Sequence, residues 1–331
     1  MNTRTTATLN THNANTKIPV GISTCLMGEQ VRFDGGHKYN STCMTQLAEY
    51  FEYTPTCPEL GMGMSVPRPT IRLVERDNEV RLLEVKDMSH DHTAAMNEFT
   101  KSRLPDLSHL CGYVVAKKSP SCGMERVQVY RENGHTNDYK SAGLFTKALM
   151  ETYPNLPVEE DGRLHDHLLR DNFISRVFIY SQWKVLEANT LTYHELYTFH
   201  SSVKYALMAH DHHCYQTLGK FISEAGRNKE PIESIQYEYI TRLMTSLKKI
   251  VKRTSHQNVL LHILGYFKDD IDATERAMLL EKINEFTQGI CPLGVPISLI
   301  RLFMKKHPKG YLERQFYLFP YPKELSIREF I

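Results

Sequence analysis

Three of the seven cysteines in this 331-residue chain occur in loops that follow predicted strands. They are Cys25 in STCLMG, Cys57 in TPTCPELGMG and Cys122 in SPSCGMERV. Because the loops after parallel strands line one crevice at the edge of an open sheet, residues at these positions converge in space. Nearby glycine and proline residues favour tight turns that leave backbone N–H groups near the sulfur atoms. The pattern predicts a metal or cluster site, and three unrelated buried thiols are the alternative.

The number of cysteines bears on which metal they would hold. Zinc usually takes four ligands and often uses a C-x-x-C pair, which this sequence lacks. A [4Fe–4S] cluster is normally held by four cysteines. With three cysteines, one iron would stay open to substrate or water and could act as a Lewis acid. Spacing alone leaves the choice between these groups open.

The N-terminal half alternates short apolar runs with helical patterns, which is typical of an α/β domain with a Rossmann-like parallel sheet. The predicted strands are 18–23, 53–56, 80–85, 111–117 and 156–160, and the predicted helices are 41–51, 89–104 and 143–151. Each cysteine of interest therefore follows a strand, at the edge of the sheet where a site is expected.

Strand signals fade after residue 163, and apolar residues then recur at helical spacing. The predicted helices are 164–187, 192–209, 214–225, 232–250, 255–266, 273–287 and 296–306. We therefore predict a mostly α-helical C-terminal domain at 191–331, joined by a helical linker at 161–190 to the α/β domain at 18–160. Residues 1–17, rich in Thr and Asn, are predicted to be a disordered tail.

Composition favours a cytoplasmic protein without a membrane span. No run of about 18 apolar residues is present, and the N-terminus lacks the apolar stretch of a secretory signal. An odd number of scattered cysteines is typical of thiols or metal ligands rather than of a disulfide framework. Residues 191–331 contain 19 Lys and Arg against 15 Asp and Glu, whereas residues 1–190 carry a net charge of −2. The basic excess thus lies in the C-terminal part.

Four basic residues near the middle of the C-terminal part could contact RNA. Lys248, Lys249, Lys252 and Arg253 would form two i,i+4 pairs on one side of a predicted helix. Such a patch suits the phosphate backbone, and a solvated helix face is the alternative. The His210–His213 segment does not place its residues on one helix face, so a structural role is favoured there over metal binding.

At the cysteine motifs the chain resembles a known family. STCLMGEQVRFDGG, CPELGMGMSVPRP and KKSPSCG resemble the TudS-like desulfidases, which act on thiolated pyrimidines. FHSSVKYALMAHD, HILGYFKDDI and FYLFPYPKEL are similar to segments of a YbgA-like domain. The combination resembles the RudS-type proteins, which remove sulfur from 4-thiouridine in tRNA.

The resemblance implies roles for individual residues. Cys25, Cys57 and Cys122 would hold a [4Fe–4S] cluster whose fourth iron captures the sulfur of the substrate. Glu59, two residues after the second ligand, would act as acid and base, and Ser119 would lie beside the reacting atoms. The alternatives are a surface acid for Glu59 and a turn residue for Ser119.

Three further residues, Arg32, Asp34 and Arg68, lie in loops after the first two cluster ligands. They are expected to contact the base or the ribose phosphate, or to pair with each other. The predicted partner is tRNA carrying 4-thiouridine, and the reaction is hydrolysis to uridine and hydrogen sulfide. Desulfuration of free thiouracil or thiouridine, a cluster-free carrier with a persulfide on Cys57, and an RNA-binding protein with a structural zinc remain as alternatives.

Overall fold

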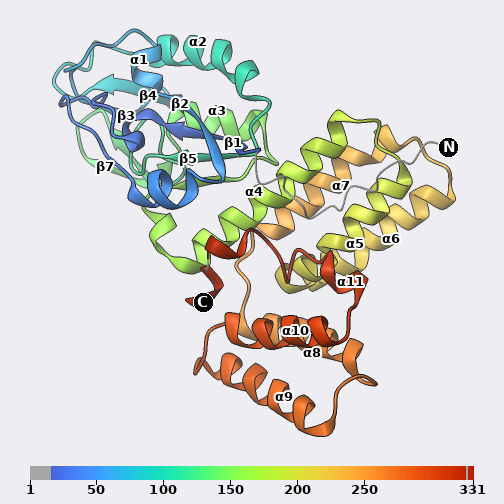
Figure 1. Ribbon diagram of the computed structural model, residues 1–331. Coiled ribbons are helices and arrows are strands. Elements are labelled where there is room, and N and C mark those ends of the chain that lie inside the picture. The colour runs from blue at the N-terminus through green and yellow to red at the C-terminus, as the bar shows by residue number, and fades with distance from the viewer. Residues whose placement is uncertain (1–15, 326) are drawn as a thin grey trace. The chain divides into compact units, whose positions relative to one another are not determined.

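The computed structural model describes residues 16–325 and 327–331, so the predicted tail lies almost wholly outside the described residues. The described chain divides into two compact units, Lys17–His165 and Asp166–Ile331. Figure 1 shows that the first unit combines strands with short helices and that the second is built of helices. The two units are described separately below.

A parallel four-stranded sheet forms the centre of the first unit, in the order β2-β1-β5-β8. Its strands are β1 (Ile18–Ser23), β2 (Phe51–Thr56), β5 (Gly112–Val115) and β8 (Val158–Glu160). Nearly every residue of β1 and β5 is buried, as is usual for inner parallel strands covered on both faces. The prediction of an α/β fold with a parallel sheet is therefore confirmed.

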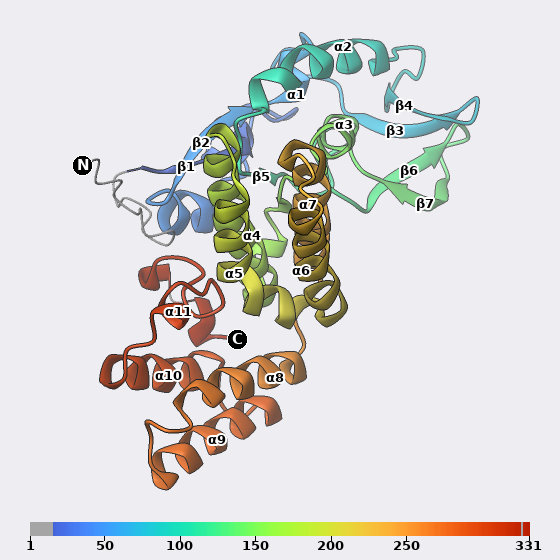
Figure 2. The same ribbon diagram turned by 90° about the vertical axis from the view of Figure 1, so that its right-hand side faces the viewer.

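The same unit contains a second sheet, and only one of its four strands was predicted. It consists of β3 (Ile71–Arg76), β4 (Glu79–Glu84), β6 (Val127–Arg131) and β7 (Thr136–Ser141), in the order β4-β3-β6-β7. β3 and β6 are parallel, and the two outer strands pair antiparallel with them (Figure 2). The edge strand β7 has no buried residue, so its polar sequence carries no strand signal.

Aromatic side chains join the helices of the first unit to the parallel sheet. The helices are α1 (Pro58–Gly61), α2 (Thr93–Arg103) and α3 (Leu144–Thr152). The ring of Phe145 lies 6.4 Å from that of Phe99 in α2 and 6.1 Å from that of Tyr113 in β5. The Tyr113 ring also covers Gly21 in β1, where an added Cβ would lie 2.2 Å from it. Gly21 therefore permits this close packing, which a larger residue would prevent.

Two predicted helices of this unit differ in the structure. The segment predicted as a helix at 41–51 forms a π-helical turn at Thr42–Leu47, and strand β2 already begins at Phe51. The helix predicted from residue 89 begins at Thr93 because Ser89 bonds to Asp87 in a turn. The carboxylate of Asp91 instead accepts the backbone N–H of Thr93 at 2.8 Å.

The second unit is mostly helical, as predicted. Its helices are α4 (His167–Ala188), α5 (Tyr193–His210), α6 (His212–Arg227), α7 (Ile232–Leu247), α8 (Arg253–Leu264), α9 (Ala273–Gln288), α10 (Gly294–Lys306) and α11 (Gly310–Glu313). The segment predicted as a linker contains α4, which belongs to this unit. The ring of Trp183 in α4 lies 5.5 Å from those of Phe199 in α5 and Tyr239 in α7. These buried aromatic residues form a core shared by three helices.

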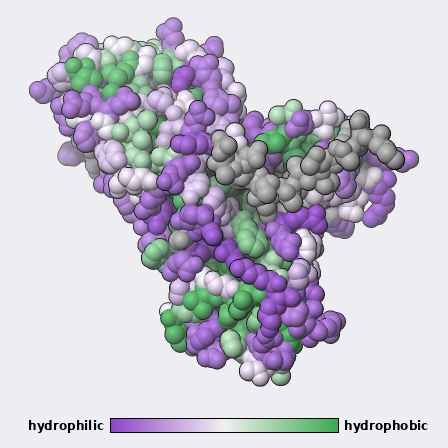
Figure 3. Space-filling view, in the orientation of Figure 1, coloured by the Kyte–Doolittle hydropathy of each residue, from purple (hydrophilic) through white to green (hydrophobic). Residues whose placement is uncertain are grey.

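Helices α8, α9 and α10 pack around a further buried cluster that includes Phe267, Phe286 and Phe303. Among the described residues, no helix has both the length and the apolar character that a membrane span requires. The face seen in Figure 3 carries hydrophilic side chains on both units, with hydrophobic residues interspersed.

Candidate active site

Cys25, Cys57 and Cys122 line one cavity of about 410 Å³ in the first unit. Cys25 follows β1 in a 3₁₀ turn, Cys57 follows β2 as the N-cap residue of α1, and Cys122 follows β5 in a tight turn. All seven cysteines are free thiols, and the other four do not line this cavity. Since β1, β2 and β5 are neighbours in one parallel sheet, the structure brings the three residues together as strand-end geometry predicts.

Backbone hydrogen bonds hold each cysteine in its loop. The carbonyl of Cys25 accepts the N–H of Lys38 at 2.8 Å, and the carbonyl of Cys57 accepts the N–H of Gly61 at 2.9 Å. The carbonyl of Cys122 accepts the hydroxyl of Thr146 at 2.7 Å. The thiols are therefore carried on backbone that is fixed before any ligand binds.

Burial disfavours the thiolate form of all three cysteines. It raises the pKa of Cys25 to about 11, with the nearby Cys57 adding to the rise. Burial also raises the pKa of Cys57, and it holds the pKa of Cys122 well above the ordinary value, with Glu59 contributing. A bound metal would replace these protons, because a thiol that coordinates a metal is deprotonated outright.

The donor set is compatible with an iron–sulfur cluster. Thiolates are the usual ligands of such clusters, and three of them here come from three separate loops around one cavity. Among the described residues, no group of three or more His, Cys, Asp and Glu side chains is arranged to hold a single metal ion.

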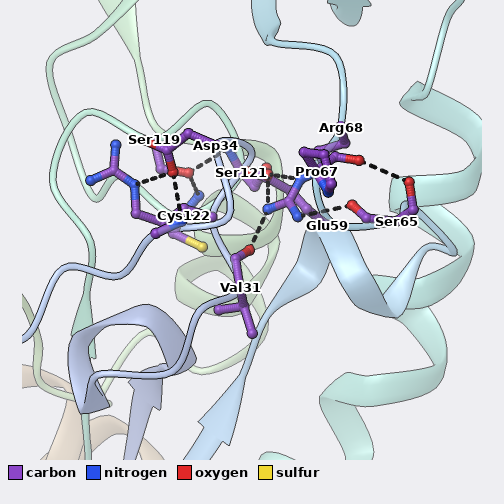
Figure 4. Close-up of polar contacts among 11 residues, drawn as sticks. Val31, Asp34, Glu59, Ser65, Pro67, Arg68, Ser119, Ser121 and Cys122 are labelled. Carbon is purple, nitrogen blue, oxygen red and sulfur yellow. Dashed lines mark hydrogen bonds and ion pairs between the residues drawn. The ribbon is translucent and has the colours of Figure 1, made fainter.

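Glu59 lies in the same cavity, in the first turn of α1, and its carboxylate is held from two sides. The guanidinium of Arg68 donates from Nε to Oε2 at 2.8 Å, and its Nη2 lies 2.6 Å from the same oxygen. The hydroxyl of Ser121 donates to Oε1 at 2.9 Å. Figure 4 shows Glu59 between these two partners. Glu59 is therefore a largely buried, oriented carboxylate and not a surface acid.

Arg68 is fully engaged by protein groups. Besides contacting Glu59, it donates to the backbone carbonyl of Val31 at 2.7 Å and to that of Ser65 at 3.3 Å. Its side chain is only 3 % exposed. This geometry favours a role for Arg68 in positioning Glu59 over the expected contact of Arg68 with the substrate.

The remaining candidates of this unit have different surroundings. Ser119 lines the cavity, and its Oγ accepts the N–H groups of Ser121 and Cys122 at 3.2 and 3.1 Å, which leaves its hydroxyl hydrogen available to a substrate. Arg32 lines the cavity at its exposed side, 3.8 Å from Asp34. Asp34 is exposed outside the cavity lining and accepts the N–H of Gly36 at 3.0 Å.

The four basic residues of the second unit do not share a helix, which corrects the prediction. Helix α7 ends at Leu247 and α8 begins at Arg253, so Lys248, Lys249 and Lys252 lie on the connection. The end of α7 is anchored by Asp211, which accepts the Ser246 hydroxyl and pairs with Lys249. These tertiary contacts stop the helix where local propensity would continue it.

Arg253 is also engaged within its own unit. It donates to the carbonyl of Phe286 at 2.7 Å, and its guanidinium lies 4.8 Å from the centre of that ring. Lys252 is exposed. His210 ends α5 and contacts the carbonyl of Lys249 through Nδ1, a structural contact.

Two features of the site were not predicted. Ser121 holds Glu59, although it lies within the SPSC motif beside a predicted ligand. Lys117 and Lys118 line the cavity together with Lys38, whose ammonium lies 3.0 Å from the carboxylate of Asp161. The position of Lys117 and Lys118 between β5 and Cys122 could have identified these two lysines from the sequence, because residues at strand ends face the crevice.

Comparison with known proteins matches each of the two units to a different family. Residues 20–161 match the family described as 2-thiouracil desulfurase, and residues 204–322 match a family described as protein of unknown function (DUF1722). The chain is 29 % identical over 158 residues to the uncharacterized protein YbgA of Escherichia coli (strain K12), covering 48 % of this chain and 93 % of that protein. A solved structure titled [4Fe-4S]-dependent thiouracil desulfidase TudS is 27 % identical, with a TM-score of 0.36, covering 45 % of this chain and 95 % of that one. These matches confirm the predicted architecture, in which a segment that matches the 2-thiouracil desulfurase family precedes a segment that matches DUF1722 and is similar to YbgA.

Proposed function

We propose that this protein is a [4Fe–4S]-dependent desulfidase that removes sulfur from 4-thiouridine in tRNA. The observation that carries the proposal is the meeting of Cys25, Cys57 and Cys122 with the oriented carboxylate of Glu59 in one cavity. The match of this unit to 2-thiouracil desulfurases supports a thiolated pyrimidine as substrate. Thiouridine and water would give uridine and hydrogen sulfide, and no electrons are gained or lost.

The three cysteines would hold the cluster, with one iron free of protein ligand. When bound, the cluster supplies a thiophilic Lewis acid that polarises the carbon–sulfur bond of the substrate. Glu59 takes a proton from the attacking water at a carboxylate oxygen and returns it to the departing sulfur. General acid–base help of this kind is typically worth about 10²–10⁴-fold. The hydroxyl of Ser119, with its oxygen already bonded to two backbone N–H groups, donates to the water or to the pyrimidine.

The tRNA part of the proposal is supported by charge. Residues 191–331 carry a net charge of +4, and phosphate contacts dominate nucleic-acid affinity. We propose that the DUF1722 domain binds the RNA and that the protein acts in the cytoplasm. Free thiouracil is the second candidate substrate, because the family match names 2-thiouracil.

The cluster-free sulfur carrier is disfavoured by the burial of the thiols. A persulfide carrier needs a reactive thiolate, and such cysteines have lowered pKa values. Burial raises the pKa of Cys57 instead. Cys25 and Cys122 show the same direction.

Anaerobic purification followed by incubation with thiolated tRNA tests the proposal. We expect broad brown absorption from the protein, and release of sulfide with formation of uridine in equal amounts. A brown protein that releases no sulfide from thiolated tRNA or from free thiouracil would overturn the desulfidase activity. A colourless protein that transfers sulfur would support the carrier. Activity on thiouracil but not on tRNA would identify the free base as substrate.

A further inference from the structure

The helical unit contains a small cavity of its own, with a volume of about 20 Å³. Helices α4, α5 and α8, the end of α7 and the C-terminal segment contribute to its lining, which includes Ser175, Arg176, Ala206, His210, His256 and Arg328. A cavity of about 10–15 Å³ accommodates one water molecule. The space therefore suits a single water molecule or a monatomic ion, and it is too small for a phosphate group.

The lining of this cavity carries more positive than negative charge. Among the described residues, its groups of fixed charge are the guanidinium groups of Arg176 and Arg328 and the carboxylate of Asp171. The two oxygens of this carboxylate lie 3.1 and 3.4 Å from Nε and Nη2 of Arg328, and the Tyr321 hydroxyl also donates to it. The charge of Arg328 is therefore balanced, and the lining retains one positive charge in excess.

The guanidinium of Arg176 is buried and fixed in the wall of the cavity. Arg176 is 6 % exposed, and its Nε donates to the amide oxygen of Asn172 at 2.9 Å. The amide nitrogen of Asn172 donates in turn to the carbonyl of Leu247 at 2.7 Å. A buried positive charge is costly unless a negative charge accompanies it. This lining therefore favours an anion over a water molecule.

The two imidazoles of the lining add no positive charge at neutral pH. Burial lowers the pKa of His210 to about 4, with Asp171 opposing the change and with Arg328 and Arg176 adding to it. Burial also holds the pKa of His256 well below its ordinary value, and Arg328 again contributes. Both imidazoles are thus neutral at pH 7, so a single negative charge balances the lining.

The hydroxyl of Ser175 supplies an unused hydrogen-bond donor to this cavity. Ser175 is 7 % exposed, and among the described residues its buried Oγ has no hydrogen-bond partner. Ser181 in the same helix is also 7 % exposed, and its hydroxyl donates to the carbonyl of Phe178 at 2.9 Å, as serine in a helix commonly does. A buried hydroxyl without a partner is costly. An anion in the cavity would accept the hydrogen bond of Ser175.

We propose that this cavity binds one monovalent anion of the size of chloride, held by the guanidinium of Arg176 and the hydroxyl of Ser175. The anion completes the charge balance of the lining and the hydrogen bonding of Ser175 together. It stabilises the helical unit, because α4, α5, α8 and the C-terminal segment all contribute to the lining. The site is separate from the cysteines and does not depend on the proposed desulfidase function.

Diffraction from crystals of the full chain grown in bromide locates the anion. We expect an anomalous bromide peak in the cavity, within hydrogen-bond distance of Ser175 Oγ. The Ser175→Ala variant should show a weaker peak there. Density without anomalous signal in the unchanged protein would identify a water molecule and overturn the anion site.

Stability in solution measures the affinity for chloride. Trp183 is the single tryptophan of the chain and is buried in α4, so its fluorescence reports unfolding of the helical unit. Chemical denaturation is followed while potassium chloride replaces potassium gluconate at constant ionic strength. We expect the free energy of unfolding to rise with chloride as mass action requires for one site that binds the folded protein.

Ser175→Ala should raise the apparent Kd for chloride about tenfold, as loss of a hydrogen bond to a charged group implies. Ser181→Ala is the matched control and should leave this Kd unchanged, because Ser181 does not line the cavity. Arg176→Gln should abolish the dependence on chloride, and if this variant does not fold, Ser175→Ala decides the question alone. Equal dependence on chloride in Ser175→Ala and Ser181→Ala would overturn the proposal, as would its absence from the unchanged protein.

Discussion

The guanidinium of Arg68 lies 2.6 Å from the carboxylate of Glu59, and the two side chains are 3 % and 14 % exposed. Because Arg68 also bonds two backbone carbonyls, the pair joins α1 to the loops that precede β3. A carboxylate so held cannot rotate away from the cysteines. The chemistry proposed for Glu59 therefore depends on a residue that need not touch the substrate.

Arg68→Lys keeps the charge and removes most of the hydrogen bonds to Glu59 and the backbone. We expect kcat for thiouracil to fall about 10–100-fold, since small misplacement of a catalytic group is costly. KM should change little if Arg68 positions Glu59. A rise in KM at unchanged kcat would instead indicate that Arg68 binds substrate. Thermal unfolding of the Arg68→Lys variant and of the unchanged protein shows whether the substitution has impaired folding.

Glu59→Gln keeps the shape of the side chain and removes its negative charge. We expect kcat to fall about 10²–10⁴-fold, the range for loss of a general acid or base. Iron and sulfide content and the visible spectrum should match those of the unchanged protein. Full activity in this variant would exclude Glu59 as the acid and base and leave the cluster assignment intact.

Replacement of Cys25, Cys57 or Cys122 by serine should abolish stable binding of the cluster. Removing one of three thiolates leaves too few protein ligands, so both iron content and desulfidase activity should be lost. Cys291→Ser is the matched control, because this half-buried thiol does not line the cavity. A variant at one of the three positions that keeps full iron and sulfide content would remove that residue from the ligand set.

His200 should make the helical unit sensitive to acid. Burial lowers its pKa to about 4, and its Nδ1 lies 3.2 Å from the Tyr239 hydroxyl. In the unfolded chain the His200 imidazole binds a proton near pH 6.5, whereas in the folded chain it stays neutral down to about pH 4. The free energy of unfolding is therefore highest above pH 6.5 and decreases as the pH falls towards 4. The loss amounts to about 3 kcal/mol for a shift of this size. Chemical denaturation at pH 7 and pH 4.5 should show a larger decrease for the unchanged protein than for His200→Gln.

The connection between α7 and α8 should contribute to tRNA affinity if the helical unit binds RNA. Lys248→Gln with Lys252→Gln is expected to weaken tRNA binding and to reduce the slope of log affinity against log salt by up to about 2. Lys268→Gln is the control, because this exposed lysine has only a long contact with its neighbour Asp269. Identical salt slopes for the two variants would exclude this connection from the RNA contact.

Much of the molecule could be predicted from local patterns. Continuous apolar runs identified β1 and β5, since inner parallel strands are buried on both faces. Apolar spacing identified the helices α5, α8 and α9 to within about two residues. The three cysteines could be named from the sequence because they follow predicted strands, whereas Glu59 and Ser119 could be named only because the motifs around them resemble those of a known family.

The tertiary structure decided what local patterns cannot contain. The second sheet escaped prediction because β7 is polar and exposed, and it is a strand only through its pairing with β6. The end of α7 is set by Asp211, which is distant in sequence. The engagement of Arg68 with Glu59 joins residues nine apart across a loop, and that of Ser121 with Glu59 joins residues 62 apart. Residue types and strand order thus determined which side chains approach the cavity. Packing between distant segments alone determined which of these side chains are held by protein partners and which remain available to a ligand.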